Sequence, residues 1–275
     1  MAHLRSYLTD KCNMLHNFAS SLPVLGAKFL YCENDYILSN LIRKTNMARI
    51  YANWKDAYGE IKRDVSENGI SVHTKTYQNK DIEKNPMFET KEIQNYSWVL
   101  QNAKSSDITG VTQPWADAEF LERIAPEDMN PGEAWKLRAE VWTQFLTDGK
   151  QSYTYNERYH RNKQLDKIIQ CLKNDPMTRQ AWLSMWDPNE DPDKFTGVGR
   201  CPCTLGYHFF YRGGKLNMHN VMRSCDIYTH FCNDVYLSIR LLEYVAEKVG
   251  MKVGNFQQTV FSLHAYRKDF EDTIF

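Results

Sequence analysis

The chain has 275 residues, of which 42% are hydrophobic and 25% are charged, as is ordinary for a globular protein. Basic and acidic residues both number 34, so there is no net basic field that would favour a nucleic-acid partner. No apolar run reaches the roughly 18 residues of a membrane span, and the N-terminus has no signal-peptide core. We therefore expect a cytoplasmic protein without a membrane or nucleic-acid partner.

The seven cysteines are odd in number and irregularly spaced, which fits reduced thiols better than a disulfide framework. The length suits one large domain, or one domain with an extension. We divide the chain into a helical N-terminal extension over 1–66 and a main domain over 67–275. Apolar residues at helical spacing predict helices over 28–44 and 46–64. The extension has no chemical motif, so a packing or dimer-contact role is favoured over a ligand lid.

The middle of the chain mixes strand and helix patterns. Polar residues and turn dipeptides predict a loop over 67–90. The remaining segments are, in chain order, a strand over 92–100, helices over 116–124, 131–145 and 164–172, a strand over 180–186 and a proline-rich acidic loop over 187–196.

The last third has the clearest pattern. Gly213-Gly214 joins two predicted strands, 207–212 and 215–222, in a tight hairpin. A helical apolar face follows over 235–249, with Gly250 as its C-terminal cap, and a final strand covers 259–265. Strands and helices interleave without strict alternation, so we expect an α+β protein with a mixed sheet.

Cys203 follows a proline at the start of a strand, which holds its thiol in a fixed place. A nearby cation such as Arg223 would lower the pKa of the thiol and make it a nucleophile. The alternative is a small buried apolar residue. Cys201 with His208 or His219 is a further alternative, a metal site, but no second cysteine pair stands at zinc spacing, so we expect no metal.

Arg223-Ser224 places a guanidinium beside a hydroxyl, a pair that can hold a phosphate, although most such dipeptides are solvated surface. Arg179 is a candidate for a second arginine at that site. Asp234 precedes an apolar helix face, so it is either a helix N-cap or a carboxylate that reads a base edge. His264 and Tyr266 are alternate residues of one strand, so they point the same way and suit a sugar hydroxyl.

With these residues in place, the spacing resembles the thymidylate synthase superfamily. The family has a Pro-Cys nucleophile, Arg-Ser-x-Asp twenty residues later, a base-reading Asn or Asp eleven after that arginine, and His-x-Tyr thirty further on. Without a gap, this chain matches at Pro202-Cys203, Arg223 to Asp226, Asp234, and His264 to Tyr266. The match covers 203–266 and extends less firmly upstream through Arg179, Tyr155, Trp142 and 92–100. The resemblance implies a thymidylate synthase-like fold, a mixed β-sheet flanked by helices, with residues 1–66 outside it.

Within the superfamily the chain looks most like the phage deoxycytidylate (dCMP) or CMP hydroxymethylase branch. The residues that carry this likeness are Thr204 after the nucleophile, Met222 before Arg223, Asn233-Asp234 and Ser262-Leu263-His264. Cytosine presents an acceptor at N3 and a donor at N4, to which a carboxyl side chain responds better than an amide in its uracil-reading orientation. Asp234 therefore favours a cytosine base. The resemblance also implies that such an enzyme works in the cytosol of a bacterium or of a phage-infected host cell.

The resemblance also implies the chemistry. Cys203 would add to C6 of the pyrimidine, and C5 would then take a one-carbon unit from 5,10-methylenetetrahydrofolate. Arg223 and Ser224 match the family's phosphate site. Asp226 matches its folate-contacting aspartate, and Trp142 would also contact folate. Arg179 matches an arginine donated by the other subunit, which implies a homodimer with shared sites.

Several alternatives stay open. The family's second phosphate arginine is replaced by Gln180, and the loop Lys80–Lys84 is a guess for a substitute. The catalytic glutamate is Glu119, which we favour, or Glu122. The chain ends nine residues after Tyr266, without the family's closing C-terminal segment, which favours hydroxymethylation by water over methylation. The extension is a possible substitute lid. Rivals are a C5-methyltransferase on dCMP, a dUMP-specific thymidylate synthase or hydroxymethylase, and a non-catalytic binding protein; ribose and deoxyribose are not distinguished.

Overall fold

The computed structural model describes residues 48–77, 80–194 and 200–269. The helix expected over 28–44, and most of the proposed extension, lie outside the described residues. From Ala48 onward the chain forms one compact unit. No helix in these described ranges is both long and apolar enough to cross a bilayer.

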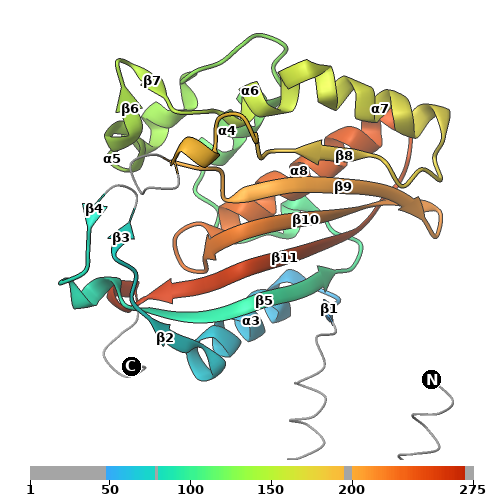
Figure 1. Cartoon of the computed structure of the whole chain (residues 1–275). Helices are drawn as coiled ribbons and strands as arrows, with labels where there is room; N and C mark the ends of the chain where they lie inside the picture. The colour runs from blue at the N-terminus through green and yellow to red at the C-terminus, as the bar shows by residue number, and fades with distance from the viewer. Residues whose placement is uncertain (1–47, 78–79, 195–199, 270–275) are drawn as a thin grey trace, which may run out of the picture. The chain divides into compact units, whose positions relative to one another are not determined.

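A seven-stranded mixed sheet is the centre of this unit (Figure 1). Its strands run in the order β1-β5-β11-β10-β9-β8, and β2 pairs with β5 at the side. β10 and β11 are parallel, as are β1 and β5, and the other pairs are antiparallel. The bounds are β1 Arg49–Tyr51, β2 Ile70–Val72, β5 Thr90–Leu100, β8 Trp182–Ser184, β9 Thr204–Arg212, β10 Lys215–Asp226 and β11 Val253–Tyr266.

Helices flank the sheet, and Figure 1 shows α3, α4 and α8 on the same side of it. The helices are α3 Trp54–Asn68, α4 Trp115–Ile124, α5 Ala139–Trp142, α6 Tyr155–His160, α7 Gln164–Asn174 and α8 Phe231–Val249. Two small hairpins complete the fold, β3 Thr76–Tyr77 with β4 Lys80–Asp81 and β6 Leu146–Thr147 with β7 Lys150–Gln151. The expected α+β class, a mixed sheet flanked by helices, is confirmed.

Trp98 of β5 lies at the centre of the core between sheet and helices, and it is fully buried. Its ring contacts those of Trp54, Phe231 and Phe256 at centroid distances of 5.6 to 6.4 Å. Its indole N–H would be costly to bury alone, and it donates to Gln258 Oε1 at 3.1 Å. One side chain thus joins α3, α8 and β11 to the middle of the sheet.

The strand register positions the residues that the sequence singled out. The Gly213-Gly214 hairpin sets β10 against β9, and the Arg223 N–H donates to the Cys203 carbonyl at 2.8 Å. β10 then runs parallel to β11, where Asp226 pairs with His264. Residues far apart in the chain therefore meet at one end of three adjacent strands.

Several local expectations differ from the structure. The helix expected over 46–64 begins only at Trp54, because Arg49–Tyr51 forms strand β1, which pairs with β5. The helix expected over 131–145 is a series of short turns, because Arg138 leaves helical geometry at φ −140° between the 3₁₀ turn Ala134–Arg138 and α5. The loop expected over 67–90 contains β2, which pairs with β5. The division after residue 66 falls within α3, whose apolar side chains pack in the same core as the sheet.

Candidate active site

A cavity of about 630 Å³ opens at the end of the sheet where β9, β10 and β11 meet. Eight of the residues singled out by the sequence line it. They are Trp142, Cys203, Arg223, Ser224, Asp226, Asp234, His264 and Tyr266. Glu119 lines a smaller adjoining recess, and Arg179 is not among the residues that line either space.

Cys203 lies one residue before β9 and presents its thiol to the cavity. Arg223 Nη2 donates to Cys203 Sγ across 3.7 Å. Burial nevertheless raises the pKa of the Cys203 thiol, against the opposing charges of Arg223 and Arg200. The cationic partner is present as expected, but desolvation outweighs it, so the lowered pKa is not found.

Arg223 is held in place by the chain around the nucleophile. Its Nε donates to the Pro202 carbonyl at 2.9 Å, and its Nη2 donates to the Cys201 carbonyl at 3.1 Å. The nucleophile and the guanidinium are therefore fixed to each other through the backbone. The Cys201 thiol lies 3.6 Å from the Asp191 carbonyl instead.

The metal alternative receives no support from this geometry. His208 Nε2 lies 3.2 Å from the Arg179 carbonyl, and His219 Nε2 lies 2.9 Å from Thr259 Oγ1. Within the described ranges, no three His, Cys, Asp or Glu side chains are grouped so as to hold a metal ion.

Asp234 lies in the first turn of α8, and it is not the N-cap, which is His230. Its carboxylate Oδ2 accepts from the Cys225 thiol at 3.4 Å and lines the cavity. Burial raises the pKa of Asp234, and the charges of His230 and Arg123 oppose that rise. The capping alternative is therefore wrong, and the carboxyl group is directed to the space in front of Cys203.

His264 and Tyr266 stand side by side on β11, each about 8% exposed, with ring centroids 5.1 Å apart. His264 Nδ1 lies 3.2 Å from the Ser262 carbonyl. Burial lowers the pKa of His264, which favours the neutral ring. A neutral imidazole beside a phenol suits one hydroxyl group of a ligand better than it suits an anion.

Asp226 has a structural task that the sequence did not reveal. Its Oδ1 accepts from the Tyr228 and Thr229 backbone N–H groups at 3.0 and 3.2 Å, which closes the turn from β10 into α8. Trp142, on the far wall, stacks on Trp115 with centroids 6.0 Å apart and planes 26° apart. The two indoles form a flat apolar wall of the cavity.

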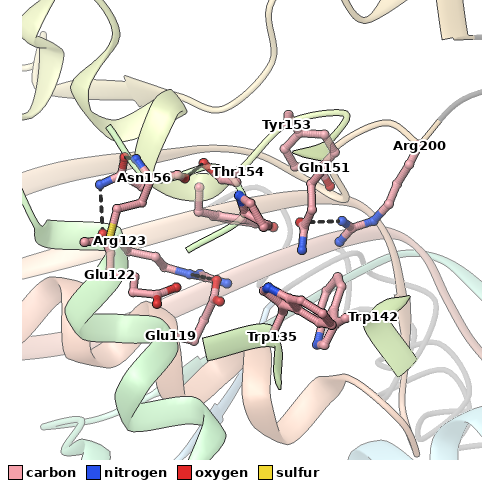
Figure 2. A pocket seen from close by; sticks show the side chains of 13 residues that line it. Glu119, Glu122, Arg123, Trp135, Trp142, Gln151, Tyr153, Thr154, Asn156 and Arg200 are labelled. Atoms are coloured by element: carbon pink, nitrogen blue, oxygen red, sulfur yellow. Dashed lines mark hydrogen bonds and ion pairs between the residues drawn. The ribbon is translucent and has the colours of Figure 1, made fainter. Parts of the chain in front are cut away.

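Glu119 and Glu122 have different partners. Glu119 Oε1 accepts from Arg123 Nε at 2.8 Å in the recess shown in Figure 2. Glu122 Oε1 accepts from the backbone N–H groups of Glu133 and Ala134 at 2.6 and 2.8 Å. Glu122 is therefore occupied in holding the 132–134 loop, which makes Glu119 the better candidate for chemistry.

The structure adds cations that the motif search missed. Arg123 and Arg200 line both the cavity and the recess, and Lys194 and Lys268 line the cavity. The described side chain of Lys84 does not line it, so the guess for the Lys80–Lys84 loop gains no support. A signal existed for Arg123, because it stands four residues after Glu119 on a predicted helix and so shares its face.

Arg179 is exposed and lies three residues before β8, which is an edge strand of the sheet. Its backbone carbonyl contacts His208, as described above. A role in the cavity of its own subunit is therefore excluded by its position. The position leaves open a role at the site of a second copy.

Comparison with known proteins gives a consistent result. The family model described as "Thymidylate synthase" matches residues 44–274. A protein of Methanosarcina barkeri named "Putative thymidylate synthase" is 30% identical over 189 residues, 65% of this chain and 83% of that protein. A protein of the same name from Methanothermobacter thermautotrophicus is 36% identical over 135 residues, 47% of this chain and 59% of that protein. The structure of thermostable thymidylate synthase A from Bacillus subtilis matches this one with a TM-score of 0.63 and 18% sequence identity. The match covers 80% of this chain and 85% of the Bacillus subtilis chain.

Proposed function

Because the chain belongs to the thymidylate synthase family of one-carbon transferases, we propose that it hydroxymethylates C5 of a cytidine monophosphate, dCMP or CMP. The one-carbon donor in this proposal is 5,10-methylenetetrahydrofolate. The observation that carries the proposal is the half-buried carboxyl of Asp234, which lines the same cavity as the Cys203 thiol.

Asp234 supports a cytosine substrate through its protonation. A carboxyl whose pKa is raised by burial can keep a proton in the complex. Its O–H would donate to cytosine N3, and its second oxygen would accept from the N4 amino group. Where the proton is not retained, the carboxylate presents only acceptors, so uracil O4 would be left unpaired at about 1–3 kcal/mol, whereas the cytosine N4 amino group would still donate.

The other residues of the cavity suit the rest of a nucleotide. Arg223 and Ser224 offer a guanidinium and a hydroxyl for the phosphate. His264 and Tyr266 offer neutral hydrogen-bonding groups for the sugar 3′-hydroxyl. Nothing in this pair selects between ribose and deoxyribose, so both nucleotides are included in the proposal.

The same cavity has room for the folate. The stacked indoles of Trp115 and Trp142 would receive the flat pterin ring, and Asp226 stands on the opposite side with a carboxylate. Methylenetetrahydrofolate would supply the one-carbon unit at the oxidation level of formaldehyde. The residues of the chain must then make C5 nucleophilic and hold the nucleotide and the folate in the orientation in which they react.

Cys203 performs the activating step in this proposal. Its thiolate forms a bond from Sγ to C6, and the electron pair of the C5–C6 double bond makes C5 nucleophilic. The Arg223 guanidinium, 3.7 Å from Sγ, stabilises the thiolate before attack. After C5 has taken the one-carbon unit, loss of the C5 proton would expel tetrahydrofolate, which leaves with the electron pair of its N–CH₂ bond. Water would then add to the resulting exocyclic methylene, and the Sγ–C6 bond would break to free the nucleotide and the enzyme.

The recess beside Glu119 supports water rather than hydride as the last reactant. It has a volume of about 30 Å³ and is lined by Trp135 and Trp142, whose buried indole N–H groups have no hydrogen-bond partner among the described residues. A polar space of this size suits an ordered water molecule. Water held there would be next to the cavity, because the recess and the cavity share Arg123, Tyr155 and three other residues.

A homodimer with shared sites belongs to the same proposal. The face of the sheet opposite α3, α4 and α8 presents Trp182 and Phe261, which are 43% and 44% exposed. Trp182 lies over Gly206, where a Cβ would meet its ring at 2.3 Å. A second copy placed on this face would cover both aromatic rings and bring its Arg179 toward the phosphate end of the cavity.

The second candidate function is thymidylate synthesis from dUMP, which the names of the relatives favour, and C5-methylation of dCMP is a variant of it. The deciding experiment incubates the protein with methylenetetrahydrofolate and each of CMP, dCMP, UMP and dUMP, and weighs the products. We expect a cytidine nucleotide to gain the mass of CH₂O. A gain of CH₂, or reaction only with a uridine nucleotide, would contradict the proposal. Cys203→Ala is the control and should give no product.

A further inference from the structure

We infer that Arg123 is a positioning residue that holds the Glu119 carboxylate in a fixed place at the recess, so that Glu119 accepts hydrogen bonds from water during the last step. The inference rests on the proposed function, which it deepens. It concerns a residue that the motifs do not include.

The ion pair between Arg123 and Glu119 is set deep in the molecule. Arg123 is 6% exposed, and its Nε donates to Glu119 Oε1 at 2.8 Å. The two residues stand four apart on α4, so both side chains leave the same face of the helix. The Glu119 side chain is 21% exposed, so water screens the pair less than it screens a surface pair, while the desolvation of Arg123 offsets part of the attraction.

Arg123 is itself fixed by the wall of the active site. Its guanidinium carbon lies 3.7 Å from the centre of the Tyr155 ring, a stacked contact that restricts its rotation. The Tyr155 hydroxyl donates to Thr204 Oγ1 at 3.1 Å, next to the nucleophile. The position of Glu119 is thereby linked, through Arg123 and Tyr155, to β9, the strand that begins directly after Cys203.

Figure 2 shows what the fixed carboxylate faces. The side chains of Glu119 and Arg123 reach from α4 toward Trp135, Trp142 and Gln151, which line the other side of the recess. An ionised carboxylate only accepts hydrogen bonds, so it would orient a water molecule by its O–H groups. Such a water molecule keeps its lone pair available for the one-carbon unit on C5.

Other titratable groups surround the pair and must be separated from it in a test. They are Glu122 on α4, Tyr155 and Tyr159 on α6, Tyr207 on β9 and Asp234 on α8. Burial raises the pKa values of Tyr155 and Tyr159, so these two side chains stay neutral. Asp234 is the main competitor, because Arg123 also acts on its carboxyl.

The first test compares the steady-state kinetics of the parent with those of Arg123→Met and Arg123→Lys. In Arg123→Met we expect kcat to fall roughly 100-fold with little change in KM for the nucleotide, because the carboxylate loses its position. The acid limb of the pH–rate profile should move to higher pH, since the cation 2.8 Å from the Glu119 carboxylate is then gone, although Arg200 still lines the recess. Arg123→Lys should restore the acid limb, because it restores the charge.

The matched control is Arg240→Met. Arg240 also pairs with a carboxylate of α4, Asp117 at 2.8 Å, and also stacks on an aromatic ring, Phe120 at 4.5 Å, but it is not among the residues lining either space. It should leave both kcat and the acid limb unchanged. An Arg123→Met protein that loses activity with its acid limb in the parent's place would show a merely structural role and overturn the inference.

The second test needs no turnover. Infrared difference spectra over a pH series should show a protonated-carboxyl band in Arg123→Met at a pH where the parent has none. The band should vanish in the double variant Arg123→Met, Glu119→Gln. A band that persists there belongs to Asp234 or Glu122, and the inference is then wrong. If the parent converts none of the four nucleotides, the proposed function fails, and the infrared result alone decides on Arg123.

Discussion

At the scale of the residue, the site depends on side chains whose sequence neighbours conceal their role. Asp234 stands where a helix cap is expected, yet α8 begins at Phe231 and the carboxylate accepts from the Cys225 thiol. Asp226 was expected to serve a ligand, and its Oδ1 closes a turn. One-dimensional patterns give residue types and spacing, but they do not give the partner of a polar atom.

Replacing Asp234 tests the choice of base. In Asp234→Asn we expect the preference to move from the cytosine to the uracil nucleotide, because an amide can donate to O4 and accept from N3–H. Unpaired groups at about 1–3 kcal/mol each correspond to a change of roughly 10- to 100-fold in the ratio of kcat/KM values. The measurement is that ratio for the paired nucleotides, on the parent and on the variant.

Asp226→Asn is the matched control for this experiment. It replaces the same type of group in the same cavity, and an asparagine oxygen can still accept from the Tyr228 and Thr229 N–H groups. We expect it to lower the rates for both bases without changing their ratio. An unchanged ratio in Asp234→Asn would remove the basis for a cytosine substrate.

At the scale of the element, the long periodic segments were predictable and the short ones were not. The hairpin of β9 and β10, the helix α8 and the strand β11 follow from alternation, a Gly-Gly turn and a helical apolar face. The six-residue α6 was missed, although Thr154 and Glu157 form a capping box that is visible in the sequence. β2 was missed because it has only three residues, Ile70–Val72, and its pairing with β5 is a tertiary contact.

A buried charge network joins α6 to Asp187 and Asp191, which follow β8 in the chain. This network gives a prediction for stability. Arg158 on α6 is 1% exposed and donates to Asp191 at 2.9 Å, and Asp191 also accepts from the Asp187 N–H at 2.8 Å. Asp191→Asn leaves the arginine short of its nearest counter-charge. We expect the free energy of unfolding in urea to fall by about 1.5–3 kcal/mol, because Asp187 and Glu190 still face the arginine.

The control for Asp191 is Glu83→Gln, which removes the exposed pair with Lys75 at 3.9 Å. Surface pairs of this kind contribute no more than about 1 kcal/mol. Equal urea midpoints for Asp191→Asn and the parent would contradict this prediction. They would mean that the attraction between the charges only balances the cost of removing them from water.

At the scale of the whole molecule, two surface features bear on the proposed homodimer. Arg179 lies outside the cavity of its own subunit, while Trp182 and Phe261 are exposed on the uncovered face of the sheet. Sequence reasoning could suggest the donated arginine only through the family resemblance, because no pattern within one chain shows which surface meets a second copy.

Mixing two inactive variants tests the shared site. Arg179→Ala lacks the donated arginine, and Cys203→Ala lacks the nucleophile, so each homodimer should be inactive. After joint refolding, the mixed dimer has one site with both residues intact. Random pairing makes half of the dimers mixed, so we expect about a quarter of the parent's activity per subunit. No recovery, with mixed dimers present by mass, would show that Arg179 serves no neighbouring site.

The position of Asp234 also bears on how such an enzyme could diverge. Since the carboxylate does not cap α8, its replacement by asparagine should leave the helix intact, and the codons of these two amino acids differ by a single base. A lineage could therefore exchange one pyrimidine for the other in one mutational step, with the nucleophile and the phosphate site unaltered. Base preference in this fold would then be a trait that one substitution can change and a second can restore, whereas the sheet around the site would stay the same.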